Sequence, residues 1–206
     1  MSSRTAHLFW NLIARKYAKT PISDIDAYQF KIDLTQQYLK STDSVLEIGS
    51  GSGATAFIHA PYVQSYLGLD YSKKMVEISY ERLRESVLTN LSFEVGSFQK
   101  YAFSKKFNVI LALNFLHLSR SLSKNLNRCY SLLEDGGYLI TSTSCFMDNK
   151  SPNYTQKLLS QFGFIPHINF FSAKTLESRL EEAGFKVLES HRPGKDQNVV
   201  FIIAQK

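Results

Sequence analysis

The part of this sequence best suited to bind and position a reactive ligand is an acid followed by a glycine-rich turn. Glu47 is the acid, and after it glycine alternates with serine as Gly49, Ser50, Gly51, Ser52 and Gly53. Because glycine has no Cβ, such a turn can fold tightly and a ligand can approach its backbone. The apolar run that starts at Val45 predicts a buried strand before the turn, and residues 54–58 predict the start of a helix after it. This order indicates a nucleotide-type site at the carboxyl end of a parallel strand.

The charge of Glu47 helps to choose between two classes of nucleotide. Gly49, Gly51 and Ala54 fit the dinucleotide fingerprint in its alanine variant, which is a weak match on its own. A carboxylate beside the turn would repel a pyrophosphate and attract a cationic group. S-adenosylmethionine (SAM) carries a sulfonium, an ammonium and a carboxylate, and no phosphate. By charge, the sequence therefore favours SAM over a nicotinamide dinucleotide.

A second acid follows at the distance expected for nucleoside binding. Residues 66–69 predict the next strand, and Asp70 ends it about 20 residues past the glycine turn, where an acid accepts hydrogen bonds from ribose hydroxyls. Both cofactor classes predict this acid, so Asp70 indicates a nucleoside without choosing between them. The alternative is an aspartate that only caps the next helix, although Ser72 is the better candidate for that cap.

Three motifs together resemble those of class I SAM-dependent methyltransferases, of the small single-domain kind related to ubiquinone and menaquinone methyltransferases. The motifs are residues 47–53, the segment Gly68–Ser72 followed by Met75, and the segment Leu132–Gly137. The resemblance runs from about Phe9 to Lys206, and the order and spacing of the motifs make it specific. It implies SAM as the cofactor and methyl transfer as the activity.

The resemblance also implies which residues bind the cofactor. The turn after Glu47 would hold the methionine end of SAM, Asp70 the ribose, and the residues after Gly96 the adenine. Asn114 would line the channel for methyl transfer. The full set that we expect at the cofactor is Tyr17, Glu47, Gly49, Ser50, Gly51, Gly53, Asp70, Tyr71, Met75, Ser97, Phe98 and Asn114.

Two members of this set depart from the family pattern or have a competing interpretation. The family commonly has an aspartate that accepts from the adenine amino group, but this chain has Ser97, whose hydroxyl is a weaker acceptor. Backbone contact at Ser97 and packing of Phe98 against the ring do not depend on that side-chain bond. Met75 is similar to a residue that covers the adenine in relatives, and the alternative is a methionine in a helix core.

His117 is the candidate for acid–base chemistry. Residues 107–113 form an apolar run that predicts a buried parallel strand, which ends at Asn114 just before His117. This strand lies beside the glycine strand across the topological switch point, so the residues after it border both cofactor and acceptor. With an ordinary pKa of about 6.5, His117 could deprotonate an acceptor hydroxyl. The competing interpretation is a half-buried histidine bonded to backbone, since methyl transfer does not always require a strong base.

The first forty residues are interpreted as a helical lid. Apolar residues between positions 8 and 13 recur at helical spacing, and in the families that this chain resembles such a helix covers the active site. There, a tyrosine that matches Tyr17 often reaches the methionine carboxylate of SAM. Residues 1–19 also contain no acid and several basic residues, as a mitochondrial presequence does. Residues 1–40 are therefore assigned to a lid, with a targeting segment as the alternative.

Residues 146–171 are interpreted as an insertion that shapes the acceptor pocket. The segment is irregular and rich in aromatic residues, namely Phe146, Tyr154, Phe162, Phe164, Phe170 and Phe171. In the families that this chain resembles, insertions at this place line the acceptor site, so these residues favour an apolar or aromatic acceptor. The alternative is a hydrophobic cap that only covers the sheet.

The remaining pattern predicts one α/β domain over residues 1–206. A chain of 206 residues, 44% of them hydrophobic, can build one substantial core. Alternating strands and helices predict a three-layer, doubly wound, Rossmann-like fold. The resemblance adds seven strands, mostly parallel, with an antiparallel last strand. Residues 123–133 are expected to form a helix that ends at Gly136 and Gly137.

Composition limits the partners and the compartment. Cys129 and Cys145 form neither a disulfide framework nor a metal-binding motif, so we expect no metal and a reducing, cytoplasmic setting. The net charge of +6 comes from scattered lysines and arginines, which favours a solvated basic surface over a nucleic-acid footprint. No apolar run is long enough for a membrane span. The expected partner is a small-molecule acceptor, and the oligomeric state is left open.

Two other functions stay open. A non-catalytic SAM-binding protein, such as a partner subunit or a sensor, needs no catalyst, and no residue here is an obligatory one. A small NAD-binding reductase would require a Tyr-x-x-x-Lys pair on a helix. Tyr101 and Lys105 have that spacing, but their surroundings predict a loop.

Overall fold

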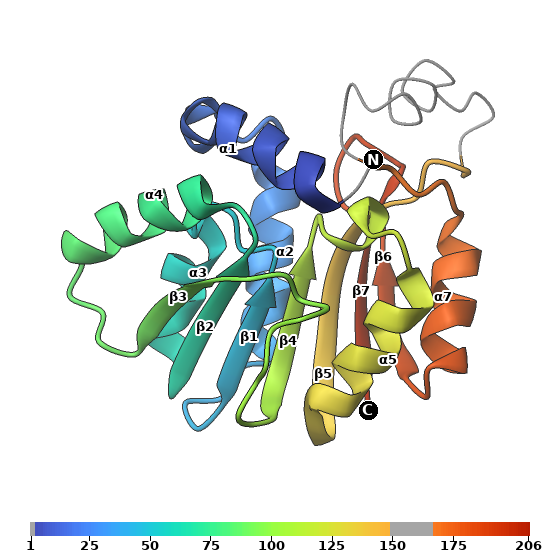
Figure 1. Cartoon of the computed structure of the whole chain (residues 1–206). Coiled ribbons are helices and arrows are strands. Elements are labelled where there is room, and N and C mark those ends of the chain that lie inside the picture. Colours follow the sequence, from blue (N-terminus) through green and yellow to red (C-terminus); the bar gives the residue numbers. More distant parts are fainter. Residues whose placement is uncertain (1–2, 149–166) are drawn as a thin grey trace.

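The computed structural model describes residues 3–148 and 167–206, with side chains from residue 7 onward. In these residues seven strands form one sheet in the order β3-β2-β1-β4-β5-β7-β6 (Figure 1). Neighbouring strands among β1 to β5 pair in parallel, and β7 runs antiparallel to both β5 and β6. The strands are β1 Ser44–Ile48, β2 Ser65–Asp70, β3 Leu91–Val95, β4 Phe107–Leu113, β5 Leu133–Ser144, β6 Lys186–His191 and β7 Val199–Gln205. This topology confirms the predicted doubly wound fold with an antiparallel last strand.

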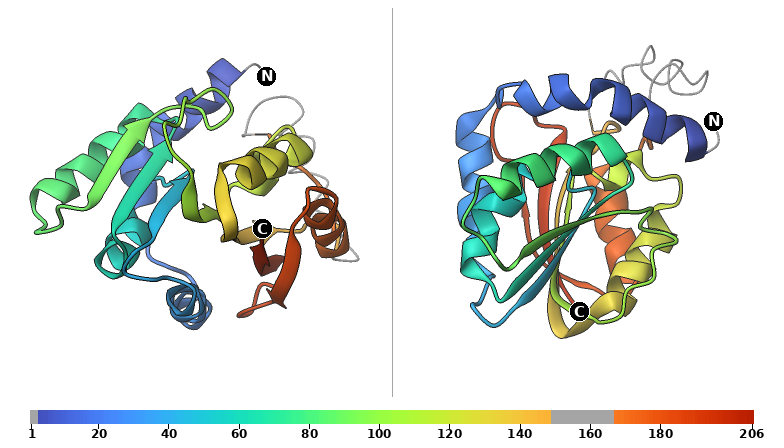
Figure 2. Two further views of the ribbon diagram at one scale, coloured as in Figure 1. Left: turned by 90° about the horizontal axis from the view of Figure 1, so that it is seen from below. Right: turned by 60° about the vertical axis from the view of Figure 1, so that its left-hand side comes forward.

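Helices cover both faces of the sheet (Figure 2). The helices are α1 Ser3–Lys19, α2 Ile25–Gln37, α3 Ala54–His59, α4 Lys73–Arg84, α5 Leu122–Leu132 and α7 Ala173–Glu182, with short 3-10 turns at Ala60–Tyr62 and Leu116–Leu118. Residues of α5 and α7 share one buried cluster with the sheet, and residues of α2, α3 and α4 share another. The fold therefore has three layers, as the sequence predicts.

The central strand β1 shows why the apolar runs form parallel strands. Leu46 and Ile48 belong to the cluster beneath α5 and α7, whereas Val45 belongs to the cluster beneath α2 and α3. Because successive side chains point to opposite faces, a strand covered on both sides needs apolar residues at nearly every position. Each such side chain contributes about 1.5–3 kcal/mol when it leaves water. Glu47 is the buried polar exception in this strand, and it lies one residue before the carboxyl end.

The N-terminal helix α1 lies next to α4, across the ends to which the parallel strands point (Figure 1). Ala14 packs with Met75 and Ile78 of α4 in a small cluster that Trp10 also contacts. The helix is thus held over the same edge of the sheet as the glycine turn. No helix among the described residues is long and apolar enough to cross a membrane.

The chain after α5 differs from the expectation. The helix ends at Leu132, and β5 begins at once at Leu133, before the glycines rather than after them. Leu133 is fully buried and pairs with Phe107 of β4. This burial extends the backbone early, so Gly136, with φ of +78°, lies inside the strand, in the stretch where its register with β4 shifts, instead of ending the helix.

Candidate functional site

The glycine turn at the end of β1 is held in a conformation that requires glycine. Gly49, Gly51 and Gly53 have φ of +71°, +53° and +78°, where an L side chain is strained. A Cβ on Gly49 would lie 2.9 Å from Phe115, and one on Gly53 would lie 2.7 Å from Phe93. A Cβ on Gly51 would meet nothing within 4 Å. Packing therefore fixes the two outer glycines, and the middle one faces open space that a ligand can enter.

Asp70, at the end of β2, joins the glycine turn to the next helix. Its Oδ2 accepts a hydrogen bond from the Gly51 N–H at 2.9 Å, and its Oδ1 accepts one from the Ser72 N–H at 2.8 Å. Burial raises the pKa of Asp70, and the backbone bonds from Ser72 and Gly51 oppose that rise. Ser72, not Asp70, caps α4, because its hydroxyl accepts from the Met75 N–H. The sequence predicts that Asp70 lies beside the ligand, but it does not predict the hydrogen bond by which Asp70 stabilises the glycine turn.

Glu47 is a buried acid whose pKa is raised by its surroundings. Its side chain is 3% exposed, and its Oε2 accepts a hydrogen bond from the Tyr66 hydroxyl at 2.9 Å. Burial raises the pKa of Glu47 to about 8; the Tyr66 bond lowers it, and the charge of Asp70 raises it further. A cation placed against this group would stabilise the carboxylate. The geometry is therefore prepared for a positively charged ligand.

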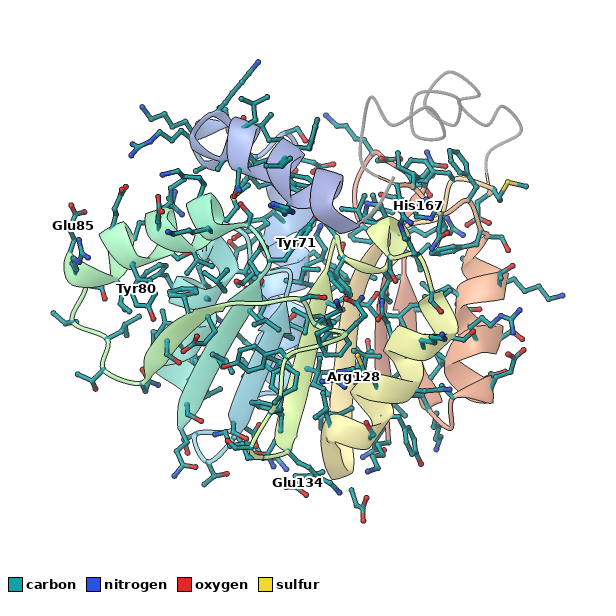
Figure 3. The ribbon with its side chains drawn as sticks, viewed as in Figure 1. Tyr71, Tyr80, Glu85, Arg128, Glu134 and His167 are labelled. Atoms are coloured by element: carbon teal, nitrogen blue, oxygen red, sulfur yellow. The ribbon has the colours of Figure 1, made fainter. Side chains whose placement is uncertain are left out.

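The helix α1 brings aromatic side chains to the same place. Burial and the negative charges of Asp70 and Glu47 raise the pKa of Tyr17, which puts its phenol within electrostatic reach of both acids. Its ring is half exposed and meets Trp10 edge to face at 5.7 Å between centroids. Trp10 also hydrogen-bonds Tyr71, which lies next to α1 in Figure 3. The expected Tyr17 and Tyr71 are therefore near the turn.

Arg82 of α4 connects α1 to the glycine turn. Its guanidinium donates to the Ser52 carbonyl at 3.0 Å and to the Ala18 carbonyl at 3.2 Å. One side chain thus bonds both the glycine turn and the last residues of α1. No local motif indicates this link, because Ala18, Ser52 and Arg82 are far apart along the chain.

The residues expected at the adenine lie on the other side of the turn. Phe98 is buried, meets Phe115 edge to face at 6.0 Å, and has the Arg128 guanidinium 5.4 Å from its ring centroid (Figure 3). The Ser97 hydroxyl donates to Gln99 at 2.7 Å, which leaves its lone pairs to accept. Met75 is 2% exposed in the α1–α4 cluster. Its burial there favours the interpretation of Met75 as a helix-core residue.

Asn114, directly after β4, has a backbone under strain. Its φ of +56° is the one positive value for a non-glycine residue in the part of the chain that the structure describes. The Asn114 N–H donates to the Ser142 carbonyl at 2.7 Å, and the next residue, Phe115, packs on Gly49. Asparagine tolerates this region better than most residues, at a cost of about 1–2 kcal/mol. Strain of this kind gathers where a ligand site needs a fixed backbone.

An acid beside an open glycine turn, a second acid that braces it and an aromatic lid are now in place, and the comparisons agree with them. Residues 22–190 match the family described as a methyltransferase domain. This chain belongs to that family. An uncharacterised methyltransferase of Bacillus subtilis, YcgJ, is 32% identical over 98 residues, which are 47% of this chain and 39% of YcgJ. The ribosomal protein L11 methyltransferase of Staphylococcus epidermidis is 25% identical over 173 residues, which are 83% of this chain and 46% of that protein.

Solved structures agree on the fold of the methyltransferase. The YcgJ crystal structure superimposes with a TM-score of 0.72 and 15% identity, covering 86% of this chain and 98% of that one. The N-methyltransferase NodS from Bradyrhizobium japonicum, in complex with S-adenosylhomocysteine, gives a TM-score of 0.67 and 16% identity, with 87% and 86% covered. The chain spans less than half the length of the curated relatives matched by sequence. These comparisons therefore show the family and the Rossmann-like fold of this chain.

His117 of this chain is poorly suited to act as a base. It lies in the turn after β4, is 8% exposed, and its Nδ1 accepts from the Ser144 N–H at 3.4 Å. Burial lowers the pKa of His117 to about 4, so the ring is neutral near neutral pH. With Nδ1 occupied as an acceptor, the neutral ring carries its proton on Nε2 and can only donate there. These properties favour the interpretation of His117 as a half-buried residue bonded to backbone.

The expected acceptor-side insertion is described only at its two ends. Residues 149–166, with Tyr154, Phe162 and Phe164, lie outside the described residues. At the ends, the rings of Phe146 and Phe170 lie 5.5 Å apart, and the Phe146 ring lies edge to face with that of His117 at 6.0 Å. Aromatic side chains therefore gather next to the turn after β4.

A pocket that the sequence did not indicate lies between α2, α3 and the sheet. Its volume is about 60 Å³, and its lining includes Tyr28, Lys31, Thr55, His59, Asn114 and Ser142. Its polar lining comes from segments that are far apart in sequence, so no local motif could have revealed it. It shares Asn114 with the site assembled above.

Proposed function

We propose that this chain transfers a methyl group from SAM to a small molecule. The observation that carries the proposal is the buried Glu47 carboxyl beside the open face of Gly51. Its pKa of about 8 means that the empty site favours the neutral acid, whereas a cation would make the carboxylate favourable. A SAM ammonium and sulfonium supply such charge, and a dinucleotide pyrophosphate does not. NodS and a Haemonchus contortus phosphoethanolamine-type enzyme, both solved with S-adenosylhomocysteine, share the fold.

In this proposal each residue has a defined task. The turn after Glu47 holds the methionine end, Tyr17 reaches its carboxylate, and Asp70 accepts from the ribose with the lone pairs that its backbone bonds leave free. Ser97 and Phe98 border the adenine. SAM, when bound, supplies an electrophilic methyl group with a neutral leaving group. The chain itself orients the acceptor in line beside Asn114 and excludes water under α1, which can supply much of the rate.

The lack of a base in this scheme agrees with the environment of His117. A histidine with a pKa near 4 is a weak general base. The acceptor atom is then already nucleophilic, or it loses its proton to solvent. We further propose the ubiquinone or menaquinone type of relationship, a cytoplasmic setting and an acceptor with an aromatic or apolar part, for which Phe146 and Phe170 provide the contact surface.

A second candidate function is a non-catalytic SAM-binding protein. The properties of His117 favour it, since no residue placed at the turn is an obligatory catalyst. Slow release of S-adenosylhomocysteine during incubation with an acceptor panel would favour the enzyme. The reductase alternative loses support, because Tyr101 and Lys105 lie in the loop between β3 and β4, not on a helix.

Calorimetric titration with S-adenosylhomocysteine tests the cofactor assignment. We expect wild-type protein to bind it and not to bind NAD⁺, and we expect Asp70→Ala to weaken binding about tenfold or more. Asp33→Ala is the matched control, since Asp33 is exposed on α2 and bonds only Gln29. If Asp70→Ala bound the nucleoside as well as wild type did, the ribose assignment would be wrong.

A further inference from the structure

Two residues that line the pocket beneath α2 have buried polar atoms without a hydrogen-bond partner among the described residues. His59, at the end of α3, is fully buried, and neither of its ring nitrogens has a hydrogen-bond partner among the described residues. The Ser142 hydroxyl, on β5, is also buried and also lacks a partner in that part of the chain. A buried donor or acceptor without a partner costs about 1–3 kcal/mol. Two such groups around one pocket indicate a polar occupant.

Lys31 of α2 adds a positive charge to the same pocket. It forms no ion pair or side-chain hydrogen bond with another described residue, and burial lowers its pKa. Asp24, the acid whose charge acts on it, accepts from the Ala27 N–H through Oδ1 and from the Lys195 backbone N–H through Oδ2. The Lys31 ammonium thus senses the charge of Asp24 but forms no direct ion pair with an acid of the described residues.

The donors match one carboxylate better than other anions. Burial lowers the pKa of His59 to about 4, so the neutral ring offers one N–H, Ser142 offers one O–H, and Lys31 offers its ammonium. A carboxylate has two oxygens that accept all three bonds. A phosphate would bring two negative charges to a pocket with one cation, Lys31. The acid Glu47 lies on the same face of the sheet, so the second charge would be unfavourable. The pocket has a volume of about 60 Å³. One water molecule requires about 10–15 Å³, so the pocket can hold a group of several atoms.

The position of the pocket connects it with the reaction site. Asn114 follows β4 directly and lines the pocket, and Thr55 belongs to the helix that begins at the glycine turn. Tyr28 lies within electrostatic reach of Glu47 and hydrogen-bonds Thr55. The SAM carboxylate already has Tyr17 on the α1 side in the proposed arrangement. A carboxylate beneath α2 therefore belongs to the other reactant.

We propose that the pocket between α2, α3 and the sheet binds the carboxylate of the methyl acceptor, with Lys31, His59 and Ser142 as its partners. The assignment of the carboxylate to the methyl acceptor rests on the proposed function. The binding of a carboxylate in this pocket does not depend on it. It narrows the acceptor class to small carboxylic acids whose apolar or aromatic part extends toward Asn114.

Benzoate and its neutral analogue benzamide are suitable probes. Each is titrated into ¹⁵N-labelled full-length protein, with and without saturating S-adenosylhomocysteine, and amide shifts are followed. We expect benzoate to shift His59 and Ser142 and to bind about tenfold or more tightly than benzamide. Lys31→Met should reduce benzoate binding to the benzamide level, and Ser142→Ala should weaken it several-fold. Lys40→Met is the matched control, since Lys40 is exposed just after α2.

The outcomes separate this inference from the proposed function. Equal binding of the two probes would show that the pocket does not select a carboxylate, and no shift with either would show that solvent alone fills it. Either result would overturn the inference. A Lys31→Met variant with about tenfold weaker nucleoside binding would also overturn it, since the cofactor carboxylate would then be the occupant. If benzoate binds as expected but the nucleoside does not, the carboxylate site stands and the methyl-transfer proposal fails.

Discussion

The hydroxyl of Tyr66 donates to the Oε2 of Glu47 at 2.9 Å, from the neighbouring strand and on the same face of the sheet. Both side chains are almost fully buried. One hydrogen bond offsets only part of the cost of burying a carboxylate, which is why the pKa of Glu47 stays high, at about 8. Near neutral pH the Glu47 carboxyl is therefore protonated, and a cationic ligand beside it favours loss of that proton.

The first prediction is that S-adenosylhomocysteine binding releases a proton from Glu47. Near neutral pH the ligand-free acid is largely protonated, and the ligand ammonium favours its carboxylate, so roughly one proton should leave per site. Calorimetry in buffers of different ionisation enthalpy measures this number. Glu47→Gln, which keeps the acceptor for Tyr66, should release none and bind more weakly. An unchanged proton count in the variant would show that another group is titrating.

The same residue should affect stability in a defined pH range. A folded pKa of about 8 lies above the unfolded value of 4.5, so this group stabilises the ligand-free protein most below pH 4.5 and that contribution is lost as pH rises to 8. The pKa values of the buried His59 and His117 are lowered to about 4, so these residues change the unfolding free energy mainly below pH 6.5. Between pH 6.5 and 8 the change is therefore assigned to Glu47. Over it, the wild-type unfolding free energy should fall by up to about 1.4 kcal/mol per pH unit relative to Glu47→Gln. Denaturant titrations at the two ends of the range test this.

The second prediction separates the backbone strain at Gly51 from its function. Gly51 and Gly136 both have positive φ, and a Cβ on either would meet no atom within 4 Å. Alanine at either site should cost about 1 kcal/mol of stability through strain alone. Gly51→Ala should also abolish nucleoside binding, because its Cβ would enter the ligand space, whereas Gly136→Ala should bind normally. Thermal unfolding and calorimetry measure the two effects; normal binding by Gly51→Ala would place the ligand elsewhere.

The third prediction concerns the hold of Arg82 on the lid helix. Arg82→Met removes the bonds to Ser52 and Ala18, each worth about 1.5–3 kcal/mol when the donor is charged. Amide exchange should therefore become faster along α1, and nucleoside binding should weaken. Arg84→Met, on the exposed side of the same helix, is the control and should change neither. If α1 exchanged equally slowly in both variants, the other contacts of α1 with α4, such as the packing of Ala14 and the bonds to Asn11, would be enough to hold it.

The fourth prediction is that His117 does not titrate near neutral pH. Burial should keep its imidazole neutral down to about pH 4, and in the nucleoside complex its ring signals should not move between pH 5.5 and 8. Nuclear magnetic resonance of the ring carbons measures this, and His117→Asn assigns the signals while keeping an acceptor for Ser144. A midpoint near the ordinary value of 6.5 would restore His117 as a candidate base.

Much of the site was readable from the sequence because its determinants are local. The turn from Gly49 to Gly53 needs glycine wherever it occurs, and an acid such as Asp70 at the end of the second strand has a fixed place in this fold. Apolar runs gave the strands for the same reason, since a strand covered on both faces has few polar positions. The boundary after α5 was wrong, because the burial of Leu133 against Phe107 is a tertiary contact that overrides the glycine signal.

The sequence by itself determined the doubly wound fold, the glycine turn and the two acids at the carboxyl ends of the first two strands, since short-range periodicity and spacing specify them. Only the tertiary structure decided the pKa of Glu47, the low pKa of His117, the Arg82 link and the polar pocket beneath α2. Each of these depends on how much water is excluded and on which distant atoms meet, and those quantities exist only once the layers have packed.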